Sequence, residues 1–346
     1  MEDTNPMSND LTDRNQTATD QSSDADLTPA EQLEACILAQ PELVSAAITE
    51  NFASIREAAG HIFGARRVRF SGAGHSAAIA EIGAVLLRAV GVDARAGHAF
   101  DMATYTPGFD GRDLLIAIAT GEDRAYASRV VQRSGHAGLP SIAIVGPAGR
   151  ISNATTTVEV GPAHVPTHLA NLPAAVAAIG GIAARFEPSS ASGESLPRLR
   201  EIVRSMLASR ETADDVARAI AGADARVLLV AAGPLMPLAQ SAALALAETG
   251  GRLATAMSVE DALLGGLRAL RKGDVVVQLA PSGPSDARHA DLARVCQVAA
   301  IDRWRIGGQP EDARWHTPLP TIEESLAPIP SAIPLLWLAQ AHSARD

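Results

Sequence analysis

The sequence predicts an α/β fold in which two copies of a doubly wound, three-layer parallel-sheet unit follow one another along the chain. Apolar segments of strand length alternate with helical segments, which is typical of a parallel sheet covered on both faces. The order helix, strand, Gly turn, helix, strand, helix, strand occurs twice. The 346 residues are also enough for one large or two ordinary domains.

The N-terminal part is expected to differ in character from the rest. Residues 1–27 contain almost nothing to bury, so we expect a disordered acidic tail. A helix is predicted to start at Thr28 and Pro29, because proline is favoured at the first helical position. Helical periodicity then continues, with a break expected at Pro41, and residues 28–67 are assigned to N-terminal helices.

The first copy of the unit is assigned to residues 68–186 and the second to residues 198–346, with a linker rich in Pro, Ser and Gly at 187–197. Strands of the first copy are expected at 68–72, 113–120, 141–146 and 156–161. One helix is expected to end at residue 90, and two more are expected at 123–135 and 172–185. In the second copy, helices are expected at 198–220, 234–250 and 286–296, a strand at 225–233, a strand plus turn at 274–283 and a strand at 297–304.

Composition excludes several classes of function. The net charge of -10 and the pI of about 5.4 argue against a nucleic-acid or anionic-membrane partner. The two cysteines have neither metal-site spacing nor the density of a secreted scaffold, so we expect a reduced cytoplasmic protein without a bound metal. No basic and apolar leader and no apolar run of ~18 residues is present, so neither a signal peptide nor a membrane span is expected.

One stretch, Val68 to Gly97, has the outline of a dinucleotide fingerprint. An apolar strand leads into Gly72-Ala-Gly74, an Ala-rich helix follows, and Asp93 lies about twenty residues on. Three interpretations are open for this turn: a nicotinamide cofactor, a smaller anion, or tight packing alone.

Three further segments point to a family. They are "ILAQPE" near the N-terminus, the stretch from Gly233 to Pro281, and "EESLAPIPSAIPLLWLAQA" near the C-terminus. With these segments in this order, the chain resembles the tandem sugar isomerase (SIS) proteins over roughly residues 31–340. The resemblance is greatest to the isomerase half of glutamine:fructose-6-phosphate amidotransferase and to the related sugar-phosphate deaminases and fructosamine-phosphate deglycases.

The resemblance implies that the glycine turn holds a phosphate and that no nicotinamide or other cofactor is needed. In SIS proteins the first turn ends in Gly-Thr-Ser and the second in Ser/Thr-Gly-Glu. Hydroxyls and backbone N–H groups at two neighbouring helix N-termini then form a compact anion site. The implied substrate-binding residues are Gly74, Ser76, Thr120, Gly121, Glu122, Asp123 and Thr167.

The second turn departs from the family pattern. Asp123 is a carboxylate where the family has a hydroxyl, and it would repel a phosphate dianion. Two alternatives follow. Either Ser76, Thr120 and backbone amides hold the anion, or the substrate is a sugar without a phosphate.

The resemblance also implies proton transfer between C1 and C2 of a sugar, for which Glu248 lies at the position of the family's catalytic glutamate. The alternative is a solvated surface carboxylate. Because Glu248 is near a helix C-terminus, we expect the helix dipole to raise its pKa.

Other family residues are replaced. Leu264 lies at the position of the ring-opening histidine, Ala245 replaces a lysine, and Lys272 is the only lysine in the chain, so no Schiff base is expected. The N-terminal cysteine of a glutaminase domain is also absent, so ammonia from glutamine is not expected. His75, His98 and His168 are the histidines expected near the pocket, and His75 and His168 join Glu248 as candidate catalytic residues.

Two hypotheses on function remain. The first is an isomerase, deaminase or deglycase acting on a sugar phosphate or amino-sugar phosphate. The second is a non-catalytic SIS module that senses a sugar phosphate, which the lost lysines and histidine favour. In both cases the expected partners are a small-molecule sugar and a second copy of the chain. The resemblance implies this homodimer, and the segment "ALALAE" and the Ala-rich helix at 172–185 are also too apolar to face solvent.

Overall fold

The structure, a computed structural model, describes residues 27–106, 108–121, 124–147, 149–162, 164–188, 191–222 and 225–344. Apart from Leu27, the tail predicted for residues 1–27 lies outside this part of the chain. The same holds for Glu122 and Asp123 of the predicted second turn.

Two parallel five-stranded sheets form the framework, which confirms the predicted fold class and its duplication. The first consists of β1 (Arg67–Gly72), β2 (Ala94–His98), β3 (Asp113–Ala119), β4 (Ser141–Val145) and β5 (Thr156–Glu159). The second consists of β6 (Val227–Ala231), β7 (Thr255–Ser258), β8 (Val275–Leu279), β9 (Asp302–Ile306) and β10 (Trp315–Thr317). Their strand orders, β2-β1-β3-β4-β5 and β7-β6-β8-β9-β10, correspond strand by strand.

Helices surround both sheets. In the first half they are α1 (Pro29–Thr49), α2 (Phe52–Gly64), α3 (His75–Ala89), α4 (Ala99–Thr104), α5 (Ala125–His136), the 3₁₀ helix η1 (His168–Asn171) and α6 (Leu172–Ala183). In the second half they are α7 (Ala191–Ser195), η2 (Leu196–Arg198), α8 (Leu199–Met206), η3 (Leu207–Ser209), α9 (Arg210–Ala219), α10 (Leu235–Gly250), α11 (Val259–Leu264), η4 (Gly266–Ala269), α12 (Asp286–Val298), η5 (Glu324–Leu326) and α13 (Pro328–Ser343).

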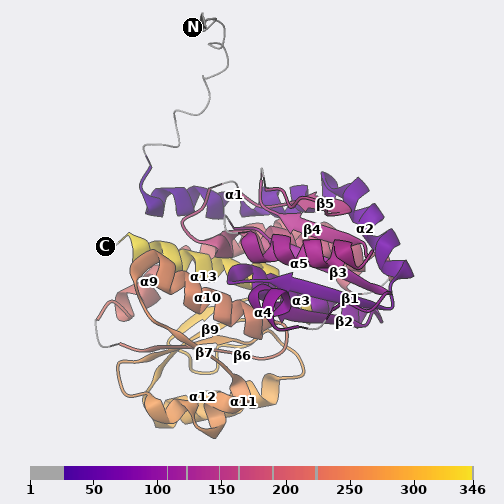
Figure 1. The fold of residues 1–346 in the computed structure, drawn as a ribbon. Helices are drawn as coiled ribbons and strands as arrows, with labels where there is room; N and C mark the ends of the chain where they lie inside the picture. Colours follow the sequence, from indigo (N-terminus) through magenta and orange to yellow (C-terminus); the bar gives the residue numbers. More distant parts are fainter. Residues whose placement is uncertain are drawn as a thin grey trace, which may run out of the picture.

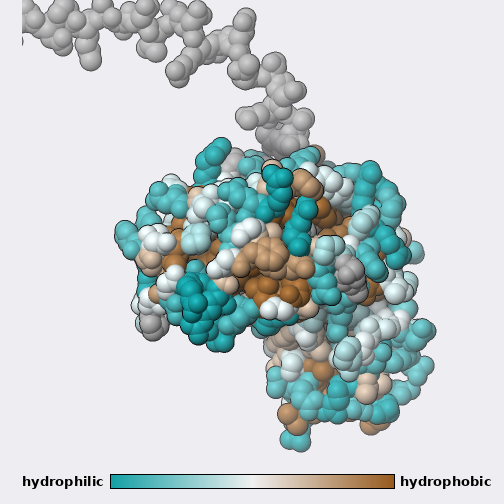
Figure 2. Space-filling view, turned by 90° about the vertical axis from the view of Figure 1, so that its right-hand side faces the viewer, coloured by the Kyte–Doolittle hydropathy of each residue, from teal (hydrophilic) through white to brown (hydrophobic). Residues whose placement is uncertain are grey.

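The two sheets share one layer of helices. Helices α3, α6, α10 and α13 lie between them, while α4 and α5 cover the outer face of the first sheet and α11 and α12 that of the second (Figure 1). In space-filling view the outer part of the second half forms a smaller lobe below the larger one (Figure 2). Among the described helices, none combines the length and the apolar character that crossing a bilayer requires.

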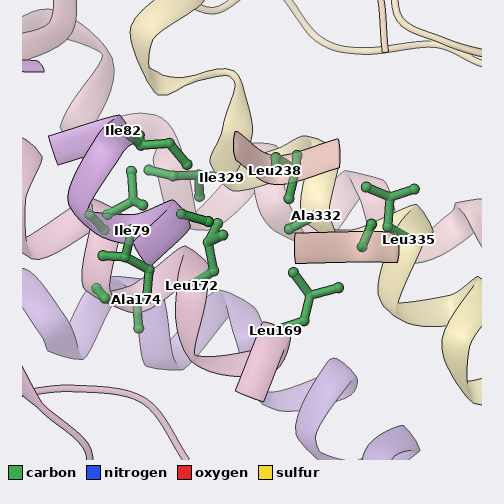
Figure 3. Packing of buried hydrophobic residues seen from close by; sticks show 14 of the residues in the cluster. Ile79, Ile82, Leu169, Leu172, Ala174, Leu238, Ile329, Ala332 and Leu335 are labelled. Atoms are coloured by element: carbon green, nitrogen blue, oxygen red, sulfur yellow. The ribbon is translucent and has the colours of Figure 1, made fainter. Parts of the chain in front are cut away.

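The shared layer is built from small and branched apolar side chains. Ile79 of α3, Leu172 of α6, Leu238 of α10 and Ile329 of α13 are all fully buried in one hydrophobic cluster. Figure 3 shows these side chains from both halves pointing toward one another. The core at the centre of the molecule therefore belongs to both copies of the unit.

The break predicted at Pro41 is wrong, because α1 continues through it to Thr49. A proline inside a helix removes one N–H donor. Here the neighbouring Gln40 side chain donates to the carbonyls of Cys36 and Ala170, the latter 2.9 Å away. Pro41 itself is buried, and α1 packs against α6, which supports the helix where the donor is missing.

The strand predicted at residues 297–304 is also wrong in its first half. Helix α12 extends to Val298, and β9 begins only at Asp302. Between them Ala300 has a positive φ of 53°, which ends the regular backbone. Val298 is apolar but 89% exposed, so it belongs to the exposed end of α12 rather than to a strand. The segment assigned to a linker, 187–197, contains the short helix α7.

Candidate active site

Two glycines define the turn between β1 and α3. A Cβ at Gly72 would lie 2.1 Å from the carbonyl oxygen of Ser76, which leaves room for glycine alone. Gly74 has a φ of 55°, a conformation that side chains with a Cβ rarely adopt. This glycine turn thereby places His75 and Ser76 at the N-terminus of α3, at the carboxyl edge of the first sheet.

A second wall comes from the other half of the chain. Ser241, Leu244 and Glu248 are spaced three and four residues apart on α10, so they lie on one face of that helix. Helix α10 packs directly against α3. The duplication therefore brings a helix N-terminus of the first half against a helix face of the second.

His75 connects these two elements. Its Nδ1 lies 2.6 Å from Oγ of Ser241, and its Nε2 lies 2.8 Å from Oε2 of Glu248. The ring is 4% exposed, so both ring nitrogens find their partners within the protein. A hydrogen-bonded chain thus runs from the buried Ser241 through His75 to the half-buried carboxylate of Glu248.

Thr167 gives the same carboxylate a second donor. It precedes η1, and its hydroxyl donates to Glu248 Oε2 over 2.6 Å. Oε2 is thus held by two side chains, whereas Oε1 makes no hydrogen bond to the described residues. One oxygen fixes the orientation of the carboxylate, and the other is available for a reacting group.

The pKa of Glu248 is lowered, which contradicts the rise predicted from the helix dipole. Burial alone would raise this pKa. The hydrogen bond and charge of His75, the hydrogen bond from Thr167 and the charge of His168 together outweigh it. The carboxylate is therefore ionised near neutral pH, the state that a proton acceptor needs.

Ser76 and Thr120 link the two predicted turns of the first half. Their hydroxyl oxygens lie 3.2 Å apart, and the backbone N–H of Thr120 donates to Ser76 Oγ over 3.3 Å. Asn171 in turn donates to the Thr120 carbonyl over 3.2 Å. The ends of β1 and β3 and the start of α6 are therefore held together behind the pocket.

Two cavities border Glu248. The smaller, of about 300 Å³, is lined by Ala73, Gly74, His75, Ser76, Gly121, His168, Leu244 and Glu248. The larger, of about 830 Å³, is lined by the start of α1, by Pro166, Glu248 and Thr249, and by the end of α13. The carboxylate lies at the boundary of the two.

The fold matches solved structures along nearly the whole chain. The C-terminal domain of glucosamine-fructose-6-phosphate aminotransferase from Francisella tularensis has a TM-score of 0.82 at 15% identity, covering 93% of this chain and 98% of that one. Tagatose-6-phosphate ketose/aldose isomerase from Escherichia coli has a TM-score of 0.72 at 20% identity, with coverages of 92% and 94%. Glucosamine-6-phosphate deaminase from Thermotoga maritima also has a TM-score of 0.72, at 14% identity, with coverages of 91% and 95%.

The chain has the tandem SIS fold. It extends over nearly the full length of all three of these structures, so the similarity includes both copies of the unit. No protein-family model matches the sequence, and no curated protein matches it either.

Most of the residues proposed for this SIS site lie together. Gly74, His75, Ser76, Gly121, His168 and Glu248 all line the smaller cavity. Thr120 and Thr167 lie behind it as supports of Ser76 and Glu248. Glu122 and Asp123 are outside the described residues.

His98 does not join them. It is exposed at the end of β2 and is not among the residues that line the cavity, so the expectation of three converging histidines is wrong. The reason is topological, because β2 is an edge strand of the sheet. Lys272 is exposed in the turn before β8, as expected.

Sequence reasoning missed Ser241 and Asn171. Ser241 could have been found from its spacing, since it lies two helical turns before Glu248. Asn171 had no such signal, because its contact with Thr120 depends on how η1 lies across the end of β3. Among the described residues, no group of side chains has the arrangement of a metal site.

Proposed function

We propose that the protein binds a sugar phosphate in the smaller cavity and moves a proton between C1 and C2 through Glu248. One observation carries the proposal: an ionised carboxylate borders the cavity with one oxygen held by His75 and Thr167 and the other without a partner among the described residues. The solved structures with this fold include a ketose/aldose isomerase and a deaminase acting on sugar 6-phosphates, which supports the same class of substrate.

We assign the following proton transfers to Glu248. In the aldose-to-ketose direction, Oε1 of Glu248 accepts the proton from C2, and the C2–H electrons form the double bond of an enediol as the carbonyl oxygen takes up a proton. The same carboxyl group then returns its proton to C1, and the C2 hydroxyl loses its proton to give the ketone. A single carboxylate suffices for both carbon steps if it lies close to both atoms.

We assign the phosphate of the sugar to the start of α3. Ser76 lines the cavity there, and backbone N–H groups at a helix N-terminus favour a phosphate. His168 also lines the cavity, where its ring lies against Gly121. We assign His168 to the proton exchange at the sugar oxygens, including ring opening.

The larger cavity favours a substrate that carries a substituent on nitrogen. It borders Glu248 directly and is too large to be filled by a hydroxyl group. Its charged lining is acidic, with Glu31 and Glu248 and no arginine or lysine among the described lining residues. Deglycation of a ketosamine phosphate, with the amine part in this cavity, is therefore the second candidate reaction.

The test is a thermal-shift screen of phosphorylated and free sugars, followed by assays of isomer, ammonia or amine release for each ligand that binds. For a turned-over ligand, Glu248→Gln should lower kcat by roughly 10²–10⁴-fold and leave affinity nearly unchanged, because the amide keeps the shape but cannot accept the proton. Glu260→Gln, an exposed carboxylate paired with Arg288 in the second half, is the matched control.

The outcomes separate the hypotheses. Binding of a sugar phosphate without release of any product would favour the sensor over the enzyme. Turnover in the Gln variant at the wild-type rate would remove Glu248 from the mechanism.

A further inference from the structure

Three arginines surround a separate cavity on the first sheet. Arg67 and Arg69 point to one face of β1, and Arg95 is the cross-strand neighbour of Arg69 on β2. All three line a cavity of about 230 Å³, together with Gly97, Met102 and others. No residue that lines this cavity also lines the one at Glu248.

Each arginine has a carboxylate next to its Nε, which forms a hydrogen bond in Arg67 and Arg95 and an ion pair in Arg69, whose guanidinium also lies over the Phe109 ring. Arg67 Nε lies 3.0 Å and Arg95 Nε 3.3 Å from the two oxygens of Asp93, and Arg69 Nε lies 2.7 Å from Asp113. The terminal nitrogens of the three side chains make no hydrogen bond to the described residues. The Nη1 and Nη2 groups of the three guanidinium groups are thus available to the oxygens of an anion.

The lining of the cavity is one-sided in charge. Within the described part of the chain, the lining contains these arginines and no carboxylate. Arg67 and Arg69 have side chains that are only 23% exposed, which distinguishes them from freely moving surface arginines. Asp93 and Asp113 pair with these arginines from outside the lining, so three cations face two carboxylates and the cluster keeps one positive charge for a ligand.

A fourth arginine holds the wall of the cavity. Arg133 of α5 donates to the backbone carbonyls of Met102 and Thr106, and both of these residues line the cavity. The helix α4 that carries Met102 is thereby tied to α5. The cavity has fixed walls as well as a fixed charge.

The geometry points to a second anion site at this place, for a phosphate group borne by a small molecule. Three guanidinium forks match the oxygens of a phosphate or pyrophosphate better than they match a single carboxylate. At about 230 Å³ the cavity is smaller than the roughly 300–1,000 Å³ of typical small-molecule pockets. It therefore takes the phosphate head group, and the rest of the ligand extends outward along β2.

The test uses calorimetric titration of the full chain with inorganic pyrophosphate. Arg95→Glu should weaken binding by about ten- to a hundredfold, the range expected for a lost charge-assisted contact. Its side chain is 66% exposed, so the fold should be unaffected, and Arg67→Gln serves as a second variant. Ser76→Ala removes the hydroxyl of the other anion site and should leave this binding in place.

The matched control is Arg218→Glu, the same charge change at an exposed arginine of α9. Equal losses in Arg95→Glu and Arg218→Glu would mean a general charge effect and would overturn the proposal. Binding that is abolished by Ser76→Ala but unchanged by Arg95→Glu would also overturn it, since all the affinity would then belong to the turn before α3. These titrations measure binding at the arginine cavity, so their outcome does not depend on whether Glu248 has the proposed catalytic role.

Discussion

At the residue scale, the state of Glu248 depends on two neighbouring donors rather than on its place in the helix. The helix dipole disfavours a carboxylate near a C-terminus, and burial disfavours its charge. His75 and Thr167 nonetheless bring the pKa below its usual value, because both place a donor on the same oxygen. A short-range contact therefore decides the charge that the reaction needs.

This account predicts the effect of Thr167→Val. The substitution keeps the shape but removes a hydrogen bond that lowers the pKa of Glu248, so that pKa should rise. The acid limb of the kcat/KM profile follows this pKa and should therefore shift to higher pH. Rates measured from pH 4 to 8 on any substrate found by the screen would show the shift.

The same substitution affects stability with a definite sign. A carboxylate whose pKa is depressed in the folded state contributes stability above its unfolded pKa, and this contribution is lost as pH falls through the folded pKa. In Thr167→Val the free energy of unfolding should therefore differ less between neutral and acid pH than it does in the wild type. Thr249→Val is the control, because that hydroxyl donates to the carbonyl of Ala245 and not to Glu248. An unchanged acid limb in Thr167→Val would refute the account.

At the element scale, the two copies of the unit have kept the same turn but not the same chemistry. Gly74 and Gly233 follow equivalent strands and have φ values of 55° and 52°. His168 lies against Gly121 in the first copy, and Glu324 lies against Gly283 in the second. Because a carboxylate replaces the histidine, the turn of the second copy is unsuited to a phosphate, and of the two turns we expect only the first to bind the sugar phosphate.

Comparison of the two turns gives a matched pair of variants. Gly74→Ala and Gly233→Ala should each cost about 1–3 kcal/mol of unfolding free energy, because alanine is strained at positive φ. Only Gly74→Ala should also weaken sugar-phosphate binding, since only that turn lines the cavity with Glu248. Urea unfolding and a ligand titration of both variants test this, and a loss of binding in Gly233→Ala without a loss in Gly74→Ala would contradict it.

The elements that could be predicted from sequence are those with a clear apolar period. Residues 113–119 and 275–279 are buried along their whole length, and their uninterrupted apolar sequence predicts a strand. The strands β2, β7 and β10 were not predicted, because β2 and β7 have mostly exposed or half-buried residues at a sheet edge and β10 has three residues. Edge strands carry a weak pattern since only one neighbour and one face constrain them.

The site could be predicted in part for a related reason. His75, Ser76 and Thr120 lie in or beside turns that directly follow predicted strands. Because parallel strands end at the same edge of a sheet, these residues are expected to lie close together. The contact of His75 with Glu248 and Ser241 joins residues 166 or more positions apart. It depends on how the two halves pack, which no local pattern specifies.

At the scale of the whole molecule, the apolar helices serve the monomer's own core. Helix α6, whose composition suggested a subunit interface, is buried on all sides against α1, α2, α3 and α13 of the same chain. That argument for a homodimer is therefore removed, and the dimer stays a prediction that rests on the resemblance. Light scattering at micromolar concentration measures it directly.

The shared core predicts that both copies unfold as one cooperative unit. Ile329 of α13 is fully buried in the cluster that also contains Ile79 and Leu172 of the first half (Figure 3). Ile329→Ala should cost about 2–5 kcal/mol, the range for deleting a buried branched side chain. Because the cluster joins the halves, hydrogen exchange should accelerate in β3 as well as in β8, although only β8 lies in the mutated half.

The control is Val298→Ala, at a side chain that is 89% exposed, which should change the exchange rate of neither strand. Faster exchange confined to β8 would show that the two copies open independently, and the helical layer between the sheets would then be an interface rather than a single core.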